Sequence, residues 1–293
     1  MKIGSAVIPA AGYGTRFLPY TKAIPKEMLP LLNTPAIHMI IQEGLQAHID
    51  QFFFITGKEK QAINNYLVPN LELEHFLDSR NKRRLLAPID ELIAKAHFSF
   101  LSQPNPRGLG HAILMAKDAI VDPYFGIMLP DDIVVAQKGA LLQLLEVACQ
   151  YGVSVIAVKE VPNHEVSSYG VIAPKQQLAE NLFEVAHLVE KPQPADAPSN
   201  LAIIGRYVLS RSIFDSLERI PPSHAGEIQL TDGIAHMLKQ NERVLALKIT
   251  GERLDIGTPM GWIKAVISLA LEHPEYGAEI QQFIAHKSLL RKD

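Results

Sequence analysis

Residues 5–17 of the chain read SAVIPAAGYGTRF, and this stretch says most about the fold. It begins with a short apolar run typical of a buried β-strand and then passes into two glycines, Thr15 and Arg16. Glycines let backbone N–H groups come close to anionic oxygens, and a guanidinium can hold a phosphate through two hydrogen bonds. With Lys26 further along, the stretch predicts a strand that ends in a phosphate-binding loop. From this loop alone, an ordinary turn with basic surface residues stays open.

Two other phosphate-binding loops fit less well. A dinucleotide fingerprint requires a third glycine and an acidic residue about twenty positions further on. Phe17 stands in place of that glycine, and residues 31–33 offer no carboxylate. A P-loop requires Lys followed by Ser or Thr after its second glycine, whereas Thr15 and Arg16 follow Gly14 here.

Composition limits the classes of protein. The chain has 293 residues, of which 47% are hydrophobic and 20% charged, as in a globular protein of one large α/β unit or two smaller domains. A net charge of -3 argues against a broad nucleic-acid or anionic-membrane surface. Cys149 is the single cysteine, so we expect no disulfide and no cysteine-based zinc site, and we expect this side chain to pack in the core. Without a signal-like start or a long apolar segment, we expect a cytoplasmic protein with no membrane partner.

Strand-like apolar runs alternate with helical patterns over the first 160 residues, which predicts a mostly parallel sheet covered on both faces. The strand-like runs lie at residues 5–10, 52–57, 97–103, 126–135, 153–161, 200–209 and 244–250. Residues 161–210 are richer in Pro, Gly and Asn, and we expect them to add a β layer to the same sheet. Helices are expected to start with Thr34 as the cap and Pro35 as the first residue, and again at Thr258 and Pro259.

Polar residues recur where predicted strands end. Gln103 ends one strand before the helix that opens at Gly108, and its amide could read the edge of a nucleobase. Residues 129–132 (LPDD) end another strand, and aspartate is a ligand that suits Mg²⁺. Asp131 is the favoured ligand there, whereas Asp132 has a turn or cap as its alternative. Residues 189–192 (VEKP), 227–232 (EIQLTD) and Asp255 follow the same pattern, and their joint presence indicates one ligand site.

These segments resemble the sugar-phosphate nucleotidyltransferase family, most closely its bacterial branch that uses UTP and glucose 1-phosphate. The shared segments span about residues 5 to 257, and TKAIPKEMLP (21–30) and SNLAIIGRYVL (199–209) are far more specific than a glycine loop. The resemblance implies an α/β, Rossmann-like three-layer sandwich with a mixed, mostly parallel central sheet and an added sugar-binding β layer. It implies one domain, with residues 1–160 mainly for the nucleotide, 161–257 mainly for the sugar phosphate and 258–293 as C-terminal helices.

The resemblance also implies roles for single residues. The nucleotide would be bound by Ala10, Ala11, Gly12, Gly14, Thr15, Arg16, Lys26, Gln103, Gly108 and Asp131, and the sugar phosphate by Gly170, Glu190 and Lys191. Mg²⁺ would be the cofactor, held by Asp131 and Asp255, and the catalytic residues would be Arg16, Lys26, Asp131 and Lys191. The family is commonly oligomeric, so a homodimer or homotetramer is expected.

The implied reaction transfers UMP from UTP to glucose 1-phosphate and releases pyrophosphate. A phosphate monoester has its second pKa near about 6, so the attacking oxygen needs no general base, and none is evident. Three alternatives stay open. Residues 254–259 (LDIGTP) are closer to the thymidylyltransferase branch, which would make the product from dTTP. A catalytically silent paralogue that binds sugar nucleotides is the second, and a nicotinamide-dependent dehydrogenase is the most distant.

Overall fold

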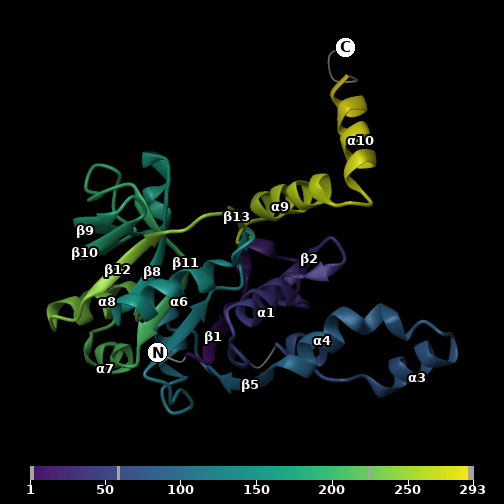
Figure 1. The fold of residues 1–293 in the computed structure, drawn as a ribbon, viewed down its shortest axis with the longest axis horizontal. Coiled ribbons are helices and arrows are strands. Elements are labelled where there is room, and N and C mark those ends of the chain that lie inside the picture. The colour runs from purple at the N-terminus through teal and green to yellow at the C-terminus, as the bar shows by residue number, and fades with distance from the viewer. Residues whose placement is uncertain (1–2, 58–59, 224–225, 290–293) are drawn as a thin grey trace.

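The computed structural model describes residues 3–57, 60–223 and 226–289, and a nine-stranded sheet runs through the middle of this part of the chain (Figure 1). Across the sheet the strands are β5 (His97–Ser102), β4 (Gln51–Thr56), β1 (Ser5–Ala10), β6 (Tyr124–Met128), β11 (Leu201–Ser210), β8 (Ser154–Glu160), β12 (Val244–Lys248), β10 (Leu182–Glu190) and β9 (Gly170–Ala179).

The sheet is mixed. β5, β4, β1 and β6 are parallel neighbours, and among the described strands only β10 and β11 run against the others. The predicted α/β class with a mixed, mostly parallel sheet is therefore confirmed. The strands expected to form an added layer, β9 and β10, continue the same sheet at its far edge, where β9 also pairs with β11.

Alternation along the strands creates the three layers. In β4, Phe52 and Phe54 face one hydrophobic core, while Phe53 and Ile55 face the other. The first core is covered by α1 (Ala36–Gln46) and α6 (Ala140–Tyr151), and the second by α5 (Leu109–Leu114), α7 (Ser212–Arg219) and α8 (Leu230–Lys239). Full burial of each such side chain stabilises the fold by about 1.5–3 kcal/mol, so both faces of the sheet must be covered.

Two small ribbons lie beside the main sheet. β7 (Asp132–Val135) pairs with β13 (Glu252–Asp255), and β2 (Pro30–Leu31) pairs with β3 (Thr34–Pro35). The run predicted as one strand at 126–135 is thus two strands, β6 and β7, separated by a turn at residues 129–131. The β7–β13 ribbon matters for function, because it brings together segments more than 100 residues apart in the sequence.

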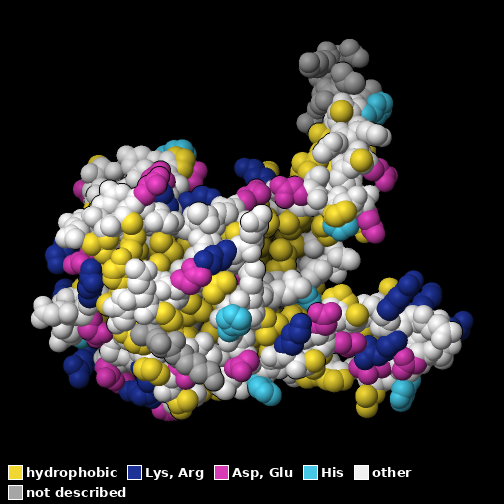
Figure 2. Space-filling model, viewed as in Figure 1, with side chains coloured by type: hydrophobic (Ala, Val, Ile, Leu, Met, Phe, Trp, Pro, Cys, Tyr) yellow, Lys and Arg dark blue, Asp and Glu magenta, His cyan; other side chains and the backbone are white. Residues whose placement is uncertain are grey.

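Two helical arms extend from the body (Figure 1). One contains α3 (Leu71–Ser79), η4 (Arg83–Leu86) and α4 (Ala87–Lys95) and follows α2 (Gln61–Tyr66). The other contains α9 (Pro259–Glu272) and α10 (Gly277–Leu289). Basic and acidic side chains alternate on the first arm (Figure 2), where Arg83 pairs with Asp90 at 2.5 Å and with Glu74 at 3.3 Å. None of the helices in the described part of the chain is long and apolar enough to cross a membrane.

Three local expectations met different outcomes. α9 starts as predicted, because the Thr258 side chain accepts a hydrogen bond from the Gly261 N–H at 3.1 Å and Pro259 is the first helical residue. The prediction for Thr34 and Pro35 is wrong, because both pair with β2 and the helix begins at Ala36. The prediction that Cys149 packs in the core is also wrong. It is exposed, since the buried stripe of α6 runs through Leu141, Leu144 and Ala148.

Candidate active site

The glycine loop follows β1 directly, and its two glycines, Gly12 and Gly14, have different surroundings. Gly14 has φ +63°, and a Cβ there would lie 3.1 Å from Thr21 Cγ2. The Thr21 hydroxyl donates to the Gly14 carbonyl at 2.8 Å and thereby holds the turn. A Cβ on Gly12 would meet nothing within 4 Å. Gly14 therefore shapes the loop, while Gly12 borders free space beside the exposed residues Thr15 and Arg16.

Lys26 lies in the 3-10 helix η3 (Lys26–Met28) and forms an ion pair with Asp131, with Nζ 2.5 Å from Oδ2. Burial disfavours both charges, but their mutual attraction outweighs it, so the pKa of Lys26 is raised and the pKa of Asp131 is lowered. Glu27 also raises the pKa of Lys26. The loop thus presents a permanent cation beside a permanent carboxylate at neutral pH.

Asp131, Asp255 and Arg16 converge around Gly257. A Cβ on Gly257 would lie 3.1 Å from Asp255 Oδ1, 3.4 Å from Asp131 Oδ2 and 3.8 Å from Arg16 Nη1. The backbone fixes this arrangement, because the Ile256 N–H donates to the Asp131 carbonyl at 2.9 Å. Arg16 Nη1 in turn donates to the Gly257 carbonyl at 3.4 Å.

This donor set fits a magnesium ion. Two carboxylates face one point, and Mg²⁺ is commonly bound by one or two carboxylates together with waters and substrate phosphates. Within the residues that the structure describes, no group of three or more His, Cys, Asp or Glu side chains could hold a metal. A site of the zinc type, closed by protein ligands, is therefore not what these residues build.

A second polar group lies between β9 and β10. Gly170 stands opposite Glu190 in the strand register, and Thr231 Oγ1 donates to Glu190 Oε2 at 2.7 Å. A Cβ on Gly170 would lie 3.1 Å from Thr231 Oγ1 and 3.2 Å from Glu190 Oε2. Lys191 follows with φ +46°, and its Nζ lies 3.5 Å from Glu190 Oε1 while its side chain is 57% exposed. The carboxylate is held, and the ammonium can turn toward a ligand.

Gln103 and Gly108 lie at the same edge of the sheet as the glycine loop. Thr56 in β4 is the register partner of both Ala10 in β1 and Ser102 in β5. Ala11 and Gln103 directly follow these two residues, so they lie two strand spacings apart, about 10 Å across the sheet. The buried Gln103 side chain contacts His111 Nδ1 through Nε2 at 2.6 Å. Burial, with help from Arg107, lowers the pKa of His111, which leaves its ring neutral and able to accept this bond.

Gly108 is required by backbone geometry. Its φ is +94°, and a Cβ there would lie 2.6 Å from the Ile228 carbonyl. The Ile228 N–H donates to the Arg107 carbonyl, and the Gly110 N–H donates to the Ile228 carbonyl, both at 2.8 Å. The segment with Gln103 and Gly108 is thereby joined to the segment that precedes Thr231.

Sequence reasoning missed Arg253 and Tyr169. Arg253 Nε donates to Asp132 Oδ1 at 2.5 Å, and its Nη2 donates to Asp255 Oδ2 at 3.2 Å. Its position two residues before Asp255 was a usable signal, because alternate residues of a strand share a face. Asp132 differs from Asp131, because both of its carboxylate oxygens accept hydrogen bonds from the protein. Its second oxygen, Oδ2, accepts from the Gly205 N–H at 2.7 Å. Tyr169 stands directly before Gly170 and contacts both Arg253 and Asp255.

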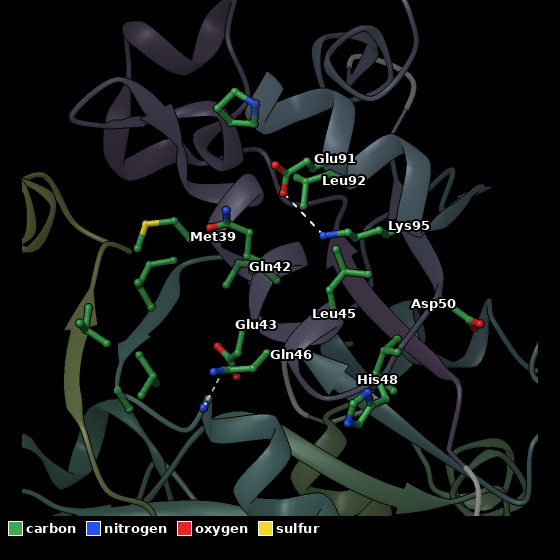
Figure 3. Close-up of a pocket in the computed structure, with 18 of the residues that line it drawn as sticks. Met39, Gln42, Glu43, Leu45, Gln46, His48, Asp50, Glu91, Leu92 and Lys95 are labelled. Carbon is green, nitrogen blue, oxygen red and sulfur yellow. Dashed lines mark hydrogen bonds and ion pairs between the residues drawn. The ribbon is translucent and has the colours of Figure 1, made fainter. Parts of the chain in front are cut away.

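A cavity of about 990 Å³ lies elsewhere, between α1, α4 and β7 (Figure 3). None of the residues predicted for the site lines it. Among its charged residues, Glu91 and Lys95 are exposed and pair with each other at 3.6 Å, and Glu43 pairs with the buried Arg206 at 2.7 Å. The polar groups that could bind phosphates and a metal ion lie instead around Gly257, and Tyr169 joins this cluster to the backbone of Lys191.

Known proteins are similar to this chain over nearly its whole length. The model of the nucleotidyl transferase family matches residues 5–270. A UTP–glucose-1-phosphate uridylyltransferase from Streptococcus pyogenes is 45% identical over 287 residues, which cover 97% of this chain and 94% of the relative. A UDP-glucose pyrophosphorylase solved with UDP-glucose is 37% identical with a TM-score of 0.85, and covers 93% of this chain and 100% of its own.

A UTP-bound enzyme of the same kind from Acinetobacter baumannii is 38% identical with a TM-score of 0.89, over 97% of this chain and 99% of its own. These structures share the mixed sheet described above, and the family match extends over most of the chain. The protein is therefore an enzyme of the nucleotidyl transferase family, alongside the UTP–glucose-1-phosphate uridylyltransferases.

Proposed function

We propose that the protein transfers UMP from UTP to glucose 1-phosphate and releases UDP-glucose and pyrophosphate. The observation that carries this proposal is the convergence of Arg16, Asp131 and Asp255 on one point beside Lys26. Such a group suits a nucleoside triphosphate with a divalent cation. Similar proteins indicate the substrates, since the Streptococcus relative is a UTP–glucose-1-phosphate uridylyltransferase and two of the similar structures hold UDP-glucose and UTP.

Residues 1–160 mainly bind UTP in this proposal. The backbone of the loop, at Ala10, Ala11, Gly12, Gly14 and Thr15, approaches the triphosphate, with Arg16 and Lys26 as its cations. Gln103 and Gly108 lie two strands away at the same sheet edge, a distance that a nucleoside can span. The contact with His111 holds the Gln103 amide in a fixed orientation, which a residue that reads a base requires.

Residues 161–257 mainly bind glucose 1-phosphate. Glu190 accepts hydrogen bonds from sugar hydroxyls, and the missing side chain at Gly170 lets Thr231 and Glu190 lie close to the backbone there. Lys191 holds the phosphate through its exposed ammonium. The described helices of the C-terminal part, α9 and α10, follow this segment.

The reaction is a displacement at the α-phosphorus of UTP. An oxygen of glucose 1-phosphate forms the new P–O bond, and the bond to pyrophosphate breaks. Lys191 holds the attacking phosphate, while Arg16 and Lys26 stabilise the charge that accumulates on pyrophosphate. Mg²⁺ bound by Asp131 and Asp255 would supply further neutralisation of phosphate charge. No protein group has to remove a proton, because the attacking phosphate is already ionised.

A panel of initial rates tests this function. UTP or dTTP is combined with glucose 1-phosphate or galactose 1-phosphate in the presence of Mg²⁺, and released pyrophosphate is measured. We expect the highest kcat/KM for UTP with glucose 1-phosphate. Faster turnover with dTTP would establish the thymidylyltransferase alternative, and folded protein without pyrophosphate release would establish a silent sugar-nucleotide-binding protein.

We also propose a homodimer or homotetramer that works in the cytoplasm. Large apolar side chains lie exposed on the arm formed by α9 and α10, with Phe283 at 57% and Ile284 at 41% exposure, and α10 packs mainly on α9. A helix of this length is marginal in water by itself, so contact with another copy would stabilise it. Light scattering of the purified protein gives the mass in solution, and a monomer at micromolar concentration would contradict the proposal.

A further inference from the structure

Arg253 offsets the repulsion between two carboxylates of the β7–β13 ribbon. The strand register places Asp132 directly opposite Asp255, and like charges in such cross-strand pairs destabilise a sheet. Arg253 lies diagonally between them and donates to both, to Asp132 at 2.5 Å and to Asp255 at 3.2 Å. Its side chain is only 12% exposed, so this guanidinium is not available to a substrate.

The same guanidinium also holds Tyr169. Arg253 Nη1 donates to the Tyr169 hydroxyl at 3.2 Å, and its Cζ lies 5.1 Å from the centre of the Tyr169 ring. The Tyr169 hydroxyl in turn donates to Asp255 Oδ2 at 3.4 Å. Arg253, Tyr169 and Asp255 therefore form a closed triangle of contacts.

Tyr169 extends this triangle to the other half of the site. Its carbonyl accepts a hydrogen bond from the Lys191 N–H at 2.9 Å. Lys191 has φ +46°, a conformation that residues other than glycine adopt rarely, so it needs such external support. A shift of Tyr169 consequently moves the backbone that carries the Lys191 ammonium.

We propose that Arg253 and Tyr169 are positioning residues that fix Asp255 and Lys191 relative to each other. This inference rests on the proposed function, in which Asp255 belongs to the cation site and Lys191 holds the attacking phosphate. The triangle of contacts then sets the distance between the two substrates, although neither Arg253 nor Tyr169 touches one. Misplacement of reacting groups by about 1 Å can cost on the order of 10²-fold in rate, so such a device has kinetic weight.

Tyr169→Phe is the sharpest test, because it removes one hydroxyl and keeps the ring. Tyr124→Phe is the control, because it likewise removes one hydrogen-bonded hydroxyl. The Tyr124 hydroxyl donates to the Gly152 carbonyl at 2.8 Å, and Tyr124 is the first residue of β6, at the end of that strand away from Asp131. We expect Tyr169→Phe to lower kcat/KM for glucose 1-phosphate by about 10- to 100-fold, the size of one or two charge-assisted hydrogen bonds. The KM for UTP should change less than about 3-fold, and Tyr124→Phe should change neither parameter.

A double-mutant cycle separates positioning from a general structural role. If Tyr169 acts through Lys191, Tyr169→Phe should weaken UDP-glucose binding in the native background and have little further effect in Lys191→Ala. Calorimetric titration of UDP-glucose in EDTA measures this without turnover and without metal. Arg253→Lys, which keeps the cation but lacks the planar fork, should give the same pattern with a larger effect. It provides a second route if Tyr169→Phe folds poorly.

The outcomes distinguish the two proposals. A native protein that is folded but releases no pyrophosphate from UTP and glucose 1-phosphate overturns the proposed function. If the native protein is active, the inference is overturned when Tyr169→Phe behaves like Tyr124→Phe. It is also overturned when Tyr169→Phe weakens UDP-glucose binding by the same factor in the Lys191→Ala background as in the native background. Loss of UTP and glucose 1-phosphate affinity to equal extents, together with a lower unfolding temperature, would likewise show a structural role only.

Discussion

Replacing Gly12 by alanine tests whether the open side of the glycine loop receives the triphosphate. A Cβ at Gly12 would meet no atom within 4 Å, and its φ lies outside the left-handed region. Gly14 differs in both respects, with φ +63° and a contact of 3.1 Å to Thr21. Gly152 provides a control, since it has φ +68° with nothing within 4 Å and caps the end of α6.

The expected magnitudes follow from these geometries. Gly12→Ala should leave the free energy of unfolding unchanged or raise it by up to about 1 kcal/mol, because alanine restricts the unfolded chain more than glycine does. Gly14→Ala and Gly152→Ala should each cost about 1–2 kcal/mol for the left-handed conformation. If backbone N–H groups at Gly12 bind phosphate oxygens, its methyl group blocks them, and kcat/KM for UTP should fall on the order of 10²-fold.

Urea unfolding and initial rates at varied UTP concentration measure the two quantities for all three variants. If the triphosphate binds at Gly12, the Gly12→Ala protein is stable and poorly active, and the Gly152→Ala protein is less stable with an unchanged KM for UTP. A Gly12→Ala protein with native UTP kinetics would place the triphosphate elsewhere. A strongly destabilised Gly12→Ala protein would show that the loop is closed in solution.

Three further predictions concern charges. Lys191→Ala should retain UTP affinity but lose about 10²–10³-fold in turnover, whereas Arg16→Ala should lower both UTP affinity and turnover. If calorimetry shows that the two variants lose UTP affinity equally, this division of roles is wrong. Glu27→Gln should lower the free energy of unfolding by about 3–5 kcal/mol, because it leaves Lys60, 2.8 Å from Glu27 and 9% exposed, as a buried unpaired cation. The double variant Glu27→Gln with Lys60→Met should recover most of that loss in urea unfolding, and a further loss would refute the pairing. Burial raises the pKa of Asp131, but the attraction of Lys26 outweighs it, so the pKa in the folded protein lies below the unfolded value. The ion pair therefore stabilises the fold above about pH 4, and this stabilisation is lost as the pH falls through the lowered pKa. The stability difference between the native protein and Asp131→Asn should therefore shrink with acid, and a difference that grows below pH 4 would reverse the assignment.

Much of the fold could be read from local pattern. β1 and β4 are continuous apolar runs because they are buried on both faces, and such runs are visible in sequence. The start of α9 was predictable because Thr258 caps its own helix through a contact three residues away. Thr34 carries the same local signal but pairs with β2, so a tertiary contact decides its conformation.

The site was less accessible to such reasoning. Gln103, Glu190 and Asp255 stand where strands end, a pattern that sequence can show, but the distances between the predicted residues depend on sheet order. The convergence of Asp131 and Asp255 depends on the β7–β13 ribbon, which local patterns do not encode. The residue roles stay predictions. What the structure adds is that Arg16, Asp131 and Asp255 meet at Gly257, and that Arg253 joins Asp255 to Tyr169.

The strength with which each cation is held indicates what it can do when phosphates arrive. Arg253 is nearly buried and makes hydrogen bonds to three side chains, so it stays in place. The side chains of Arg16 and Lys191 are exposed, and their contacts with described residues are long, at 3.4 and 3.5 Å, so they can turn toward a substrate at little cost. Lys26 lies between these cases, because its bond of 2.5 Å to Asp131 Oδ2 is short but its partner is also a predicted metal ligand. A metal ion at Asp131 would compete with Lys26 for the charge of this carboxylate, and the Lys26 ammonium would then be held less firmly and could turn toward the phosphates.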